Sequence, residues 1–472
     1  MNCLHLYDSQ TRKNKPVTPI EGDTLRFYCC GPTVYGPAHI GNFRTFVMQD
    51  VFRRVVESTG LKTRHVRNLT DVDDKTIRQS QAEGVSLGDF TTGWTEKFHK
   101  DSESLNLLPP HVEPSAVDHI PEQIEMIATL IEKGHAYRSD DGSVYFKVDS
   151  FEDYGKLSRL KEREITTNNV TQETEREDSD EYERESAADF VLWKSRKEED
   201  GPNFWESPWG QGRPGWHLEC SAMCKKHLGD SFDVHSGGED LLFPHHENEI
   251  AQSECCNGAA FVNHWFHISH LMVDGAKMSK SLNNLYTIDQ LEEMGHTAEE
   301  VRYVLLSGSY GQQLNFTLDS LKAAGKALER LRDFKEKLGA IPDGVATSLD
   351  DFGPFRPVID ALLNDLNTSD ALGKLFSLIK QYQKEIPDLD NDTLNEARRG
   401  FAYCIFALGL KLDIPKTSKS NVPENVAQMA ADRWEAKQNK DWAKSDELRD
   451  AIAAEGWQVK DTKEGYTVAP LA

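Results

Sequence analysis

The segment Leu25-Arg-Phe-Tyr-Cys-Cys30, followed by Gly31-Pro32, is the stretch that decides the fold. Its six residues predict a short buried strand, which Gly31-Pro32 ends. A loop (33–42) follows, and then a helix from about Phe43 to Ser58 with an apolar stripe. The next predicted strand is Leu61 to Leu69. This strand–loop–helix–strand order predicts an α/β fold with a parallel sheet, and ligands at the carboxyl ends of its strands.

A four-residue stretch, His39-Ile-Gly41-Asn42, lies where this loop meets the start of the helix. The free amide groups and the positive dipole end of a helix N-terminus bind anions such as phosphate. Gly41 would let a ligand approach the backbone closely. Taken alone, the four residues also fit a plain loop, so a phosphate site needs support from elsewhere in the chain.

A basic loop far downstream offers a second candidate for phosphate chemistry. Lys277-Met-Ser-Lys280-Ser281 follows the turn-forming pair Asp274-Gly275. Two lysines three residues apart can neutralise a polyphosphate as point charges. A solvated basic loop is the competing interpretation when the stretch is taken by itself.

The stretch from Phe232 to Glu249 places three histidines and five acids around a Gly-Gly turn. Pro244 predicts that a helix begins there, because proline is best tolerated in the first turn. On that helix His245 and Glu249 are four residues apart and share one face. An imidazole and a carboxylate on one face form half of a zinc site. A polar, solvated helix start is the alternative interpretation.

The other half of such a site must come from elsewhere in the chain. Cys29, Cys30 and Cys220 are candidate ligands, because thiolates are soft donors that suit zinc. His246, next to the first histidine on the same helix, could also reach the ion. Spacing therefore leaves open which of two adjacent cysteines and which of two adjacent histidines would bind.

The composition restricts the class of protein. The chain has 472 residues and a net charge of −24, so we expect two to four domains and no non-specific nucleic-acid binding over the whole surface. Eight cysteines without an export signal indicate reduced thiols or metal ligands and a cytoplasmic location. No apolar run approaches the roughly 20 residues of a membrane helix. The acids of 173–185 predict an exposed loop.

Two of these stretches match motifs of a known class of enzymes. His39-Ile-Gly-Asn42 resembles the HIGH motif of class I aminoacyl-tRNA synthetases, and Lys277-Met-Ser-Lys-Ser281 matches their KMSKS motif in full. Within that class the chain closely resembles the cysteinyl-tRNA synthetase family. That likeness is carried by five further stretches, Cys30–Tyr35, Val66–Lys75, Asp189–Lys194, Pro208–Met223 and Phe243–Ser253. Asn42 departs from the class, which usually has His there; Asn keeps a hydrogen-bond donor but carries no charge.

The resemblance implies ATP-dependent ligation of L-cysteine to tRNA(Cys) through a cysteinyl-adenylate, by a chain that we expect to be a monomer. It implies one zinc ion per chain, which selects the substrate as a thiolate and is held by Cys30, Cys220, His245 and Glu249. ATP, expected to arrive with magnesium, would be bound at Gly41 and Lys280.

The resemblance also implies the roles of single side chains. The catalytic residues would be His39, Asn42, Lys277 and Lys280. The amino-acid pocket would contain Thr70, Trp216, His217, His235 and Asp240. Among these, Asp240 is the expected partner of the substrate ammonium group, although a helix cap is the competing interpretation for it.

The fold implied is a Rossmann-like parallel-sheet catalytic domain with an insertion, followed by an α-helical bundle and a small C-terminal α+β domain. The expected parts are the first half of the catalytic domain (1–115), an insertion that covers the acceptor end of tRNA (116–210), the second half with the lysine loop (211–290), a stem-contact and helical bundle domain (291–411), a linker (412–424) and a small anticodon-binding domain (425–472).

Apolar spacing predicts further elements. The insertion should hold an amphipathic helix and a strand pair near Val144, and the bundle and tail should hold several helices before a final β-like segment. The expected helices are Ile120–Lys133, one that includes 318–338, Val358–Glu385, Asp392–Lys411, Asn425–Asn439 and Trp442–Glu455, and the β-like segment is Trp457–Val468.

Two alternatives compete with the synthetase. The first is a paralogous ligase that joins cysteine to an amino-sugar, although its family usually lacks the C-terminal domain expected here. The second is a non-catalytic, zinc-containing RNA-binding protein, which draws on Asn42 and is opposed by the intact lysine motif. Adenylate formation and tRNA charging would separate the three.

Overall fold

The computed structural model describes residues 3–160, 189–278, 282, 284–340, 346–412, 423–439, 441–461 and 466–470. The acidic stretch 173–185 and Lys280 lie outside the described residues. The chain divides into two units, Met1–Lys411 and Leu412–Ala472. In the part that the structure describes, no helix is long and apolar enough to cross a membrane.

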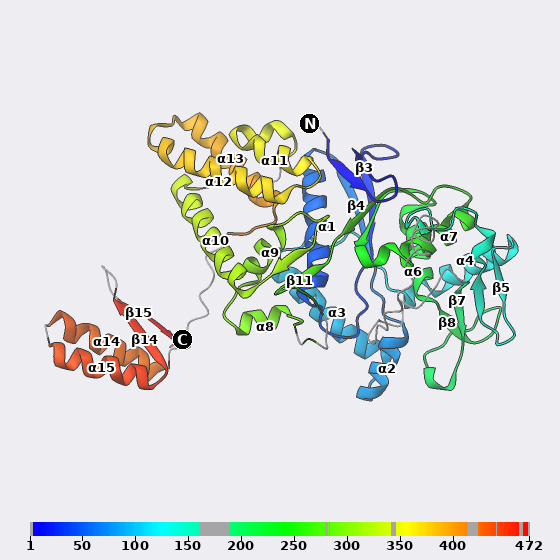
Figure 1. The fold of residues 1–472 in the computed structure, drawn as a ribbon, viewed down its shortest axis with the longest axis horizontal. Coiled ribbons are helices and arrows are strands. Elements are labelled where there is room, and N and C mark those ends of the chain that lie inside the picture. Colours follow the sequence, from blue (N-terminus) through cyan, green and yellow to red (C-terminus); the bar gives the residue numbers. More distant parts are fainter. Residues whose placement is uncertain are drawn as a thin grey trace, which may run out of the picture. The chain divides into compact units, whose positions relative to one another are not determined.

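The first unit is built on a parallel four-stranded sheet (Figure 1) with the order β10–β9–β3–β4. Its strands are β3 (Thr24–Cys29), β4 (Lys62–Arg67), β9 (Phe232–Gly238) and β10 (Val262–Ile268). All three strand pairs are parallel, which confirms the sheet predicted from the segment that begins at Leu25. At the carboxyl edge Cys29 pairs with Ser236 of β9 and Arg67 of β4, so the residues that follow these strands come together.

Helix α1 (Ile40–Ser58) begins three residues before the predicted start at Phe43. The reason is a capping box, which satisfies two free amide groups of the first turn. The Asn42 amide donates to Nδ1 of His39 at 3.2 Å, and the His39 amide donates to Oδ1 of Asn42 at 3.1 Å. The predicted apolar stripe of this helix is buried.

Helices cover both faces of this sheet because successive side chains of a strand point to opposite sides. Phe27 of β3 contacts Phe52 of α1 with ring centroids 5.2 Å apart. Its neighbour Tyr28 packs on the other face in one core cluster with Met223 of α6 (Trp216–Leu228). The remaining helices of this part are α2 (Asp74–Glu83), α3 (Leu87–Ser104) and α7 (His245–Asn257).

The predicted insertion (116–210) supplies three strands of a second, antiparallel sheet with the order β5–β6–β7–β8, and β8 lies just beyond its predicted end. Its strands are β5 (Ala136–Arg138), β6 (Val144–Phe146), β7 (Phe190–Ser195) and β8 (Gly212–Pro214). Helix α4 (Ile120–Glu132) confirms the amphipathic helix predicted there. The predicted strand pair is thus extended by two strands that follow the acidic stretch, and their residues carry no clear alternation of apolar and polar side chains.

A small three-stranded sheet follows the central sheet, with the order β12–β11–β13. It consists of β11 (Leu271–Val273), β12 (Ala276–Lys277) and β13 (Leu314–Phe316). Two short helices lie between its last two strands in sequence, α8 (Ile288–Glu293) and α9 (Ala298–Leu306). An N-terminal hairpin, β1 (His5–Asp8) with β2 (Lys13–Pro16), is antiparallel.

The last part of the first unit is helical. Its helices are α10 (Leu318–Leu338), α11 (Arg356–Leu363), α12 (Thr368–Glu385) and α13 (Asn391–Ala407). The predicted single helix Val358–Glu385 is wrong, because the chain breaks between α11 and α12. There Asp365 and Leu366 have φ values of 61° and 45°. Oδ1 of Asp365 accepts a hydrogen bond from the Tyr7 amide at 2.8 Å, so a contact with the N-terminal hairpin holds the break.

A buried charge network ties α1 to this helical part. Oδ2 of Asp50 accepts hydrogen bonds from Nε of Arg54 at 2.8 Å and from Nη2 of Arg302 at 2.5 Å. All three side chains are at most 3% exposed. Arg302 also donates to the backbone carbonyls of Leu408 at 3.0 Å and Leu105 at 2.8 Å. One carboxylate therefore fixes segments from four regions of the chain.

The second unit confirms the two helices and the β-like tail predicted for it. Its elements are α14 (Glu424–Gln438), α15 (Trp442–Ala454), β14 (Trp457–Asp461) and β15 (Tyr466–Pro470). The two strands are antiparallel. Val426, Ala430 and Ile452 form its small core.

Candidate active site and metal centre

Four potential metal ligands meet at the carboxyl edge of the central sheet. Cys30 directly follows β3, Cys220 lies in α6, and His245 and Glu249 lie on one face of α7. Each of the four is 7% exposed or less. The helix pair predicted from the spacing of four is confirmed, since His245 Nε2 and Glu249 Oε1 are 3.0 Å apart.

The ligand atoms of these four side chains fit a tetrahedral zinc ion. The Sγ atoms of Cys30 and Cys220 are 4.0 Å apart, and Cys30 Sγ is 3.8 Å from Glu249 Oε1. All four ligand atoms lie within 4.8 Å of one another. Zinc–sulfur bonds of about 2.3 Å in a tetrahedron place two sulfurs about 3.8 Å apart. Two thiolates, an imidazole and a carboxylate are also the donors that zinc prefers.

A second set of donors overlaps the first. It keeps Cys30 and Glu249 and replaces the other two by His235 and His246. His246 Nε2 is 3.4 Å from Cys30 Sγ, and His235 Nε2 is 2.9 Å from Glu249 Oε2. The two adjacent histidines of α7 thus both face the centre, as their spacing allowed. The first set has two sulfur donors and the second has one, so the first is the softer site.

Interactions inside the cluster shift the pKa values of its four members. Burial alone would lower the pKa of His245, but hydrogen bonds to Cys220 and Glu249 raise it to about 10. Burial alone would raise the pKa of Cys220, but hydrogen bonds with Cys30 and His245 lower it to about 6. Burial also opposes ionisation of Glu249, whose pKa His235 and His245 nevertheless lower to about 2. Burial and the neighbouring Cys220 raise the pKa of Cys30 well above its ordinary value. The cluster therefore pairs Glu249 and the acidified thiol of Cys220 with His245, and a divalent cation that binds here must displace the protons of His245 and Cys30.

Three of the residues predicted for the amino-acid pocket surround this cluster. His217 Nδ1 lies 2.8 Å from His245 Nδ1, so it orients the imidazole from behind. The Trp216 ring lies over His245 with centroids 4.3 Å apart. His235 contacts the cluster through Glu249, as given above.

A polar network beside the cluster contains two residues that lie in stretches carrying the family resemblance but were given no role there, Asn68 and Glu219. The buried carboxylate of Glu219 accepts hydrogen bonds from Asn68 Nδ2 at 3.2 Å and from the Thr70 hydroxyl. Burial raises the pKa of Glu219 well above its ordinary value. Thr70 was predicted as a pocket residue, whereas Asn68 and Glu219 were not singled out. Their positions next to matched residues, and Glu219 directly before Cys220, were the available signal.

Asp240 does not join the buried cluster. It lies in the short 3-10 helix η5 (Glu239–Leu242) that follows β9, and its side chain is exposed. Its Oδ1 approaches the backbone of Gly238 so closely that a Cβ there would collide with it. The expected contact with a substrate ammonium group stays a prediction.

The two predicted phosphate-binding stretches lie against each other. The Ile40 amide donates to the carbonyl of Tyr286 at 2.9 Å, which ties the start of α1 to the chain after the lysine loop. A Cβ built on Gly41 would lie 3.0 Å from Met278 Sδ. Lys277 is exposed, and its carbonyl accepts a hydrogen bond from Asn284 at 3.1 Å. The N-terminus of α1 thus lies beside Met278 and Tyr286, two described residues on either side of Lys280 in this loop.

Asn42 exchanges hydrogen bonds with His39, and these explain how asparagine can replace the usual histidine at the last position of this motif. Its side-chain oxygen accepts the amide of His39, while Nδ1 of His39 accepts the amide of Asn42. The imidazole of His39 is thus held with Nδ1 as acceptor, which leaves Nε2 as the N–H donor. The side-chain amide of Asn42 keeps two further N–H donors.

Comparisons with known proteins identify the family of the chain. Residues 16–326 match the family described as tRNA synthetases class I (C) catalytic domain. A cysteine–tRNA ligase of Opitutus terrae is 55% identical over 99% of this chain and 99% of that protein, and one of Chlamydia caviae is 42% identical over 99% and 98%.

The fold also resembles that of a solved structure. Methionyl-tRNA synthetase of Mycobacterium tuberculosis in complex with methionyl-adenylate superposes with a TM-score of 0.55 over 82% of this chain and 90% of that chain, at 13% sequence identity. That likeness concerns the fold, and it confirms the predicted Rossmann-like α/β class. Because the family match covers most of the chain and the sequence relatives cover all but 1% of it, the chain belongs to the cysteine–tRNA ligase family of the class I aminoacyl-tRNA synthetases.

Proposed function

We propose that the protein joins L-cysteine to tRNA(Cys) in two ATP-dependent steps. The observation that carries this proposal is the buried centre with two thiols, one imidazole and one carboxylate, at the same edge of the sheet as the N-terminus of α1. Such a centre would select a thiol substrate, and the helix N-terminus beside the lysine loop would bind phosphates. Family membership supports the same activity.

Zinc is the ion that the donor set favours, held by Cys30, Cys220, His245 and Glu249. When bound, it supplies a soft Lewis-acid position that prefers a thiolate to a hydroxyl. This matters because cysteine and serine differ by one atom, and ordinary pocket contacts separate such isosteres poorly. His217 holds the imidazole of His245, and Trp216 covers it, so the pocket is preorganised and partly closed to water.

The first step is attack of the cysteine carboxylate on the α-phosphate of ATP. The carbon–oxygen–phosphorus linkage of cysteinyl-adenylate forms, and pyrophosphate leaves. His39 would donate from Nε2 to the phosphates, with the amide groups at Gly41 and the side chain of Asn42 beside it. Lys277 and Lys280 would neutralise the leaving pyrophosphate, with magnesium bound to the nucleotide. In the second step the terminal ribose hydroxyl of tRNA takes the cysteinyl group and AMP leaves.

Replacing Gly41 with alanine tests whether the two phosphate-binding stretches work together. The new Cβ would lie 2.9 Å from Nδ1 of His39 and 3.0 Å from Met278 Sδ, so one of the two must move. We expect pyrophosphate exchange to slow about 10- to 100-fold, because small misplacements of positioned groups cost that much. Gly88→Ala is the matched control, since nothing lies within 4 Å of a Cβ there. Equal rates for both variants would contradict the contact.

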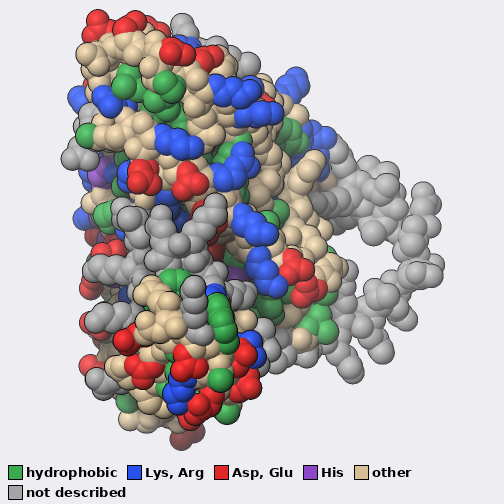
Figure 2. Space-filling view, turned by 90° about the vertical axis from the view of Figure 1, so that its left-hand side faces the viewer, with side chains coloured by type: hydrophobic (Ala, Val, Ile, Leu, Met, Phe, Trp, Pro, Cys, Tyr) green, Lys and Arg blue, Asp and Glu red, His purple; other side chains and the backbone are tan. Residues whose placement is uncertain are grey.

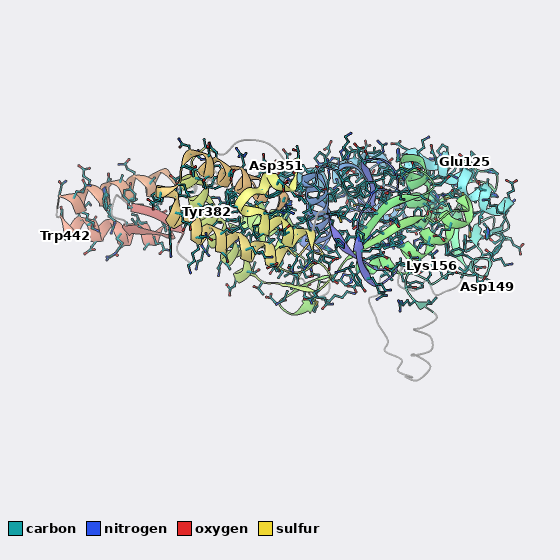
Figure 3. All side chains as sticks on the ribbon, turned by 90° about the horizontal axis from the view of Figure 1, so that it is seen from above. Glu125, Asp149, Lys156, Asp351, Tyr382 and Trp442 are labelled. Atoms are coloured by element: carbon teal, nitrogen blue, oxygen red, sulfur yellow. The ribbon has the colours of Figure 1, made fainter. Side chains whose placement is uncertain are left out.

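Surfaces outside this site are consistent with a tRNA partner. Helix α10 exposes Lys322, Lys326 and Arg330, one side chain per turn. Figure 2 shows Lys and Arg side chains interspersed with Asp and Glu on the face that it displays. In the second unit Trp442 is 58% exposed at the start of α15, where Figure 3 labels it. Lysines and arginines contact phosphates, and exposed aromatic rings stack on unpaired bases. We place the acceptor end at the insertion and the anticodon at the second unit, on a cytoplasmic monomer.

Three measurements test the proposal together. Metal analysis should give one zinc per chain, pyrophosphate exchange with ATP should depend on cysteine, and the full chain should charge a tRNA(Cys) transcript with labelled cysteine. Exchange without charging, but with transfer of cysteine to an amino-sugar, would identify the paralogous ligase. Binding of tRNA without exchange would identify a non-catalytic RNA-binding protein. Serine in place of cysteine should support exchange at least about 100-fold less well.

A further inference from the structure

A hydrogen-bond network connects the backbone next to the two cysteine ligands. The Gly31 amide donates to Oδ1 of Asn68 at 2.8 Å, and Asn68 Nδ2 donates to Oε1 of Glu219 at 3.2 Å. Thr70 shares that oxygen of Glu219. Gly31 follows Cys30 directly, and a Cβ on it would collide with the carbonyl of Asn68, so the two segments are packed as closely as backbones allow.

The direction of each hydrogen bond in this network is fixed. The backbone amide of Gly31 can only donate, so the atom of Asn68 that it meets is the side-chain oxygen. The NH2 group of Asn68 must then face Glu219, which makes Oε1 of Glu219 an acceptor. Because Oε1 accepts from Asn68, a proton on this carboxyl group is favoured on the other oxygen, Oε2, and the Thr70 hydroxyl donates its one proton to Oε1. This direction holds whether or not the other carboxyl oxygen carries a proton.

This direction determines which kind of ligand group the Thr70 hydroxyl can bind. A hydroxyl has one donor and two acceptor positions. The donor is used on Glu219, and one acceptor position faces Asn68 Nδ2 at 3.3 Å. Any ligand group that meets the remaining position must therefore be a hydrogen-bond donor. An acceptor there would face a lone pair in a residue that is 2% exposed, which is unfavourable.

We propose that Glu219 is a positioning residue that makes Thr70 an obligatory acceptor for the ammonium group of the amino-acid substrate. Thr70 lies beside the loop after Cys30, where its backbone exchanges hydrogen bonds with Pro32 and Val34, and Glu219 adjoins Cys220. Only three bonds separate the thiol sulfur of cysteine from its ammonium nitrogen. A substrate held at the centre by sulfur therefore presents its ammonium group within reach of the segments that flank the two ligands. This inference rests on the proposed cysteine-ligase function.

Binding of two thiols that differ in the ammonium group provides the test. L-Cysteine and 3-mercaptopropionate share the thiol and the carboxylate, and only cysteine has the donor. Their affinities for the zinc-loaded full chain are measured by titration calorimetry, and zinc content is measured on the same samples. The wild type should prefer cysteine by at least about 10-fold, the worth of one hydrogen bond to a charged group. Thr70→Val and Glu219→Met should each reduce that preference to about 2-fold or less, with zinc retained.

Conservative variants distinguish a positioning role of Glu219 from an effect of its charge and from an effect on folding. Glu219→Gln keeps a side-chain oxygen that can accept from Asn68 and Thr70, so it should keep most of the preference, and Thr70→Ser should do the same. Loss of the preference in Glu219→Gln as complete as in Glu219→Met would overturn the proposal, because the charge of Glu219 would then be what matters. An unchanged preference in Thr70→Val would also overturn it.

A surface carboxylate supplies the matched control for charge removal. Glu125 is exposed on α4, where Figure 3 labels it, and Glu125→Gln should bind both thiols as the wild type does. Failure of the proposed function would look different, because the wild type itself would then bind neither thiol through zinc. If the Glu219→Met variant unfolds, the comparison of Thr70→Val with the wild type still tests the proposal, because valine and threonine have nearly the same shape.

Discussion

Replacing Cys220 with serine is expected to remove the metal and with it the selection of cysteine. The variant loses one of two sulfur donors, and a serine hydroxyl at neutral pH is a poor ligand for zinc. Zinc content after dialysis should fall from one per chain to a small fraction, and the KM for cysteine in pyrophosphate exchange should rise by more than about 100-fold. The KM for ATP should change little, because the phosphate-binding stretches come from other elements. Metal analysis and exchange kinetics check both.

The control is Cys3→Ser, since Cys3 lies in the N-terminal segment and its Sγ contacts only His5 at 3.9 Å among the contacts described. Unchanged zinc content in the Cys220 variant would refute the assignment of the ligand. A matched pair then decides between the two overlapping donor sets. His245→Ala should lose zinc, and His246→Ala should retain most of it; the reverse result would assign the ion to the set with His235 and His246.

Replacing Asp50 with alanine is expected to destabilise the first unit more than any surface change. The variant leaves the guanidinium groups of Arg54 and Arg302 buried without their shared carboxylate. Removing one partner of a buried pair costs about 3–5 kcal/mol. Urea unfolding followed by circular dichroism should show a lower midpoint for the first unit. Asp360→Ala is the control, because its pair with Arg356 is partly exposed and is worth less than about 1 kcal/mol.

The Asp50 network also predicts a pH dependence. Burial alone would raise the pKa of Asp50, but Arg302 and Arg54 hold it below its ordinary value. A carboxyl whose pKa is lowered in the folded state contributes stability above its unfolded pKa of about 3.9 and loses it as the pH falls through the folded pKa. Asp50→Asn should remove that contribution, so its stability deficit should shrink on acidification below about pH 4. A constant deficit would contradict the role of the charge.

Local patterns accounted for much of the fold. The apolar stripe of α1 and the strands on either side of it carry their own period, so the parallel unit could be predicted from 25–69 alone. The break between α11 and α12 could not, because Asp365 is held there by the amide of Tyr7, far away in sequence. The early start of α1 depended on a capping box whose polar residues resemble any loop.

The site was predictable to a similar extent. The pair His245 and Glu249 followed from helix spacing, and the two candidate cysteine ligands, which the structure brings next to that pair, followed from the family resemblance. The role proposed for Glu219 could not be found this way, because it depends on contacts with Asn68 and Thr70, which lie about 150 residues earlier. The choice between His245 and His246 stayed open in the sequence for a physical reason, since both imidazoles do face the cluster.

The distance along the chain between the proposed metal ligands has a consequence for synthesis. Cys30 and Glu249 are separated by 219 positions. At 5–20 residues per second, a ribosome needs about 10 to 45 s to make the intervening polypeptide. During that interval the thiols of Cys29 and Cys30 exist in a nascent chain that still lacks α7, so the donor set cannot be complete. If the proposed zinc ion binds at these four residues, it can be acquired only late in synthesis, after the whole insertion has been translated.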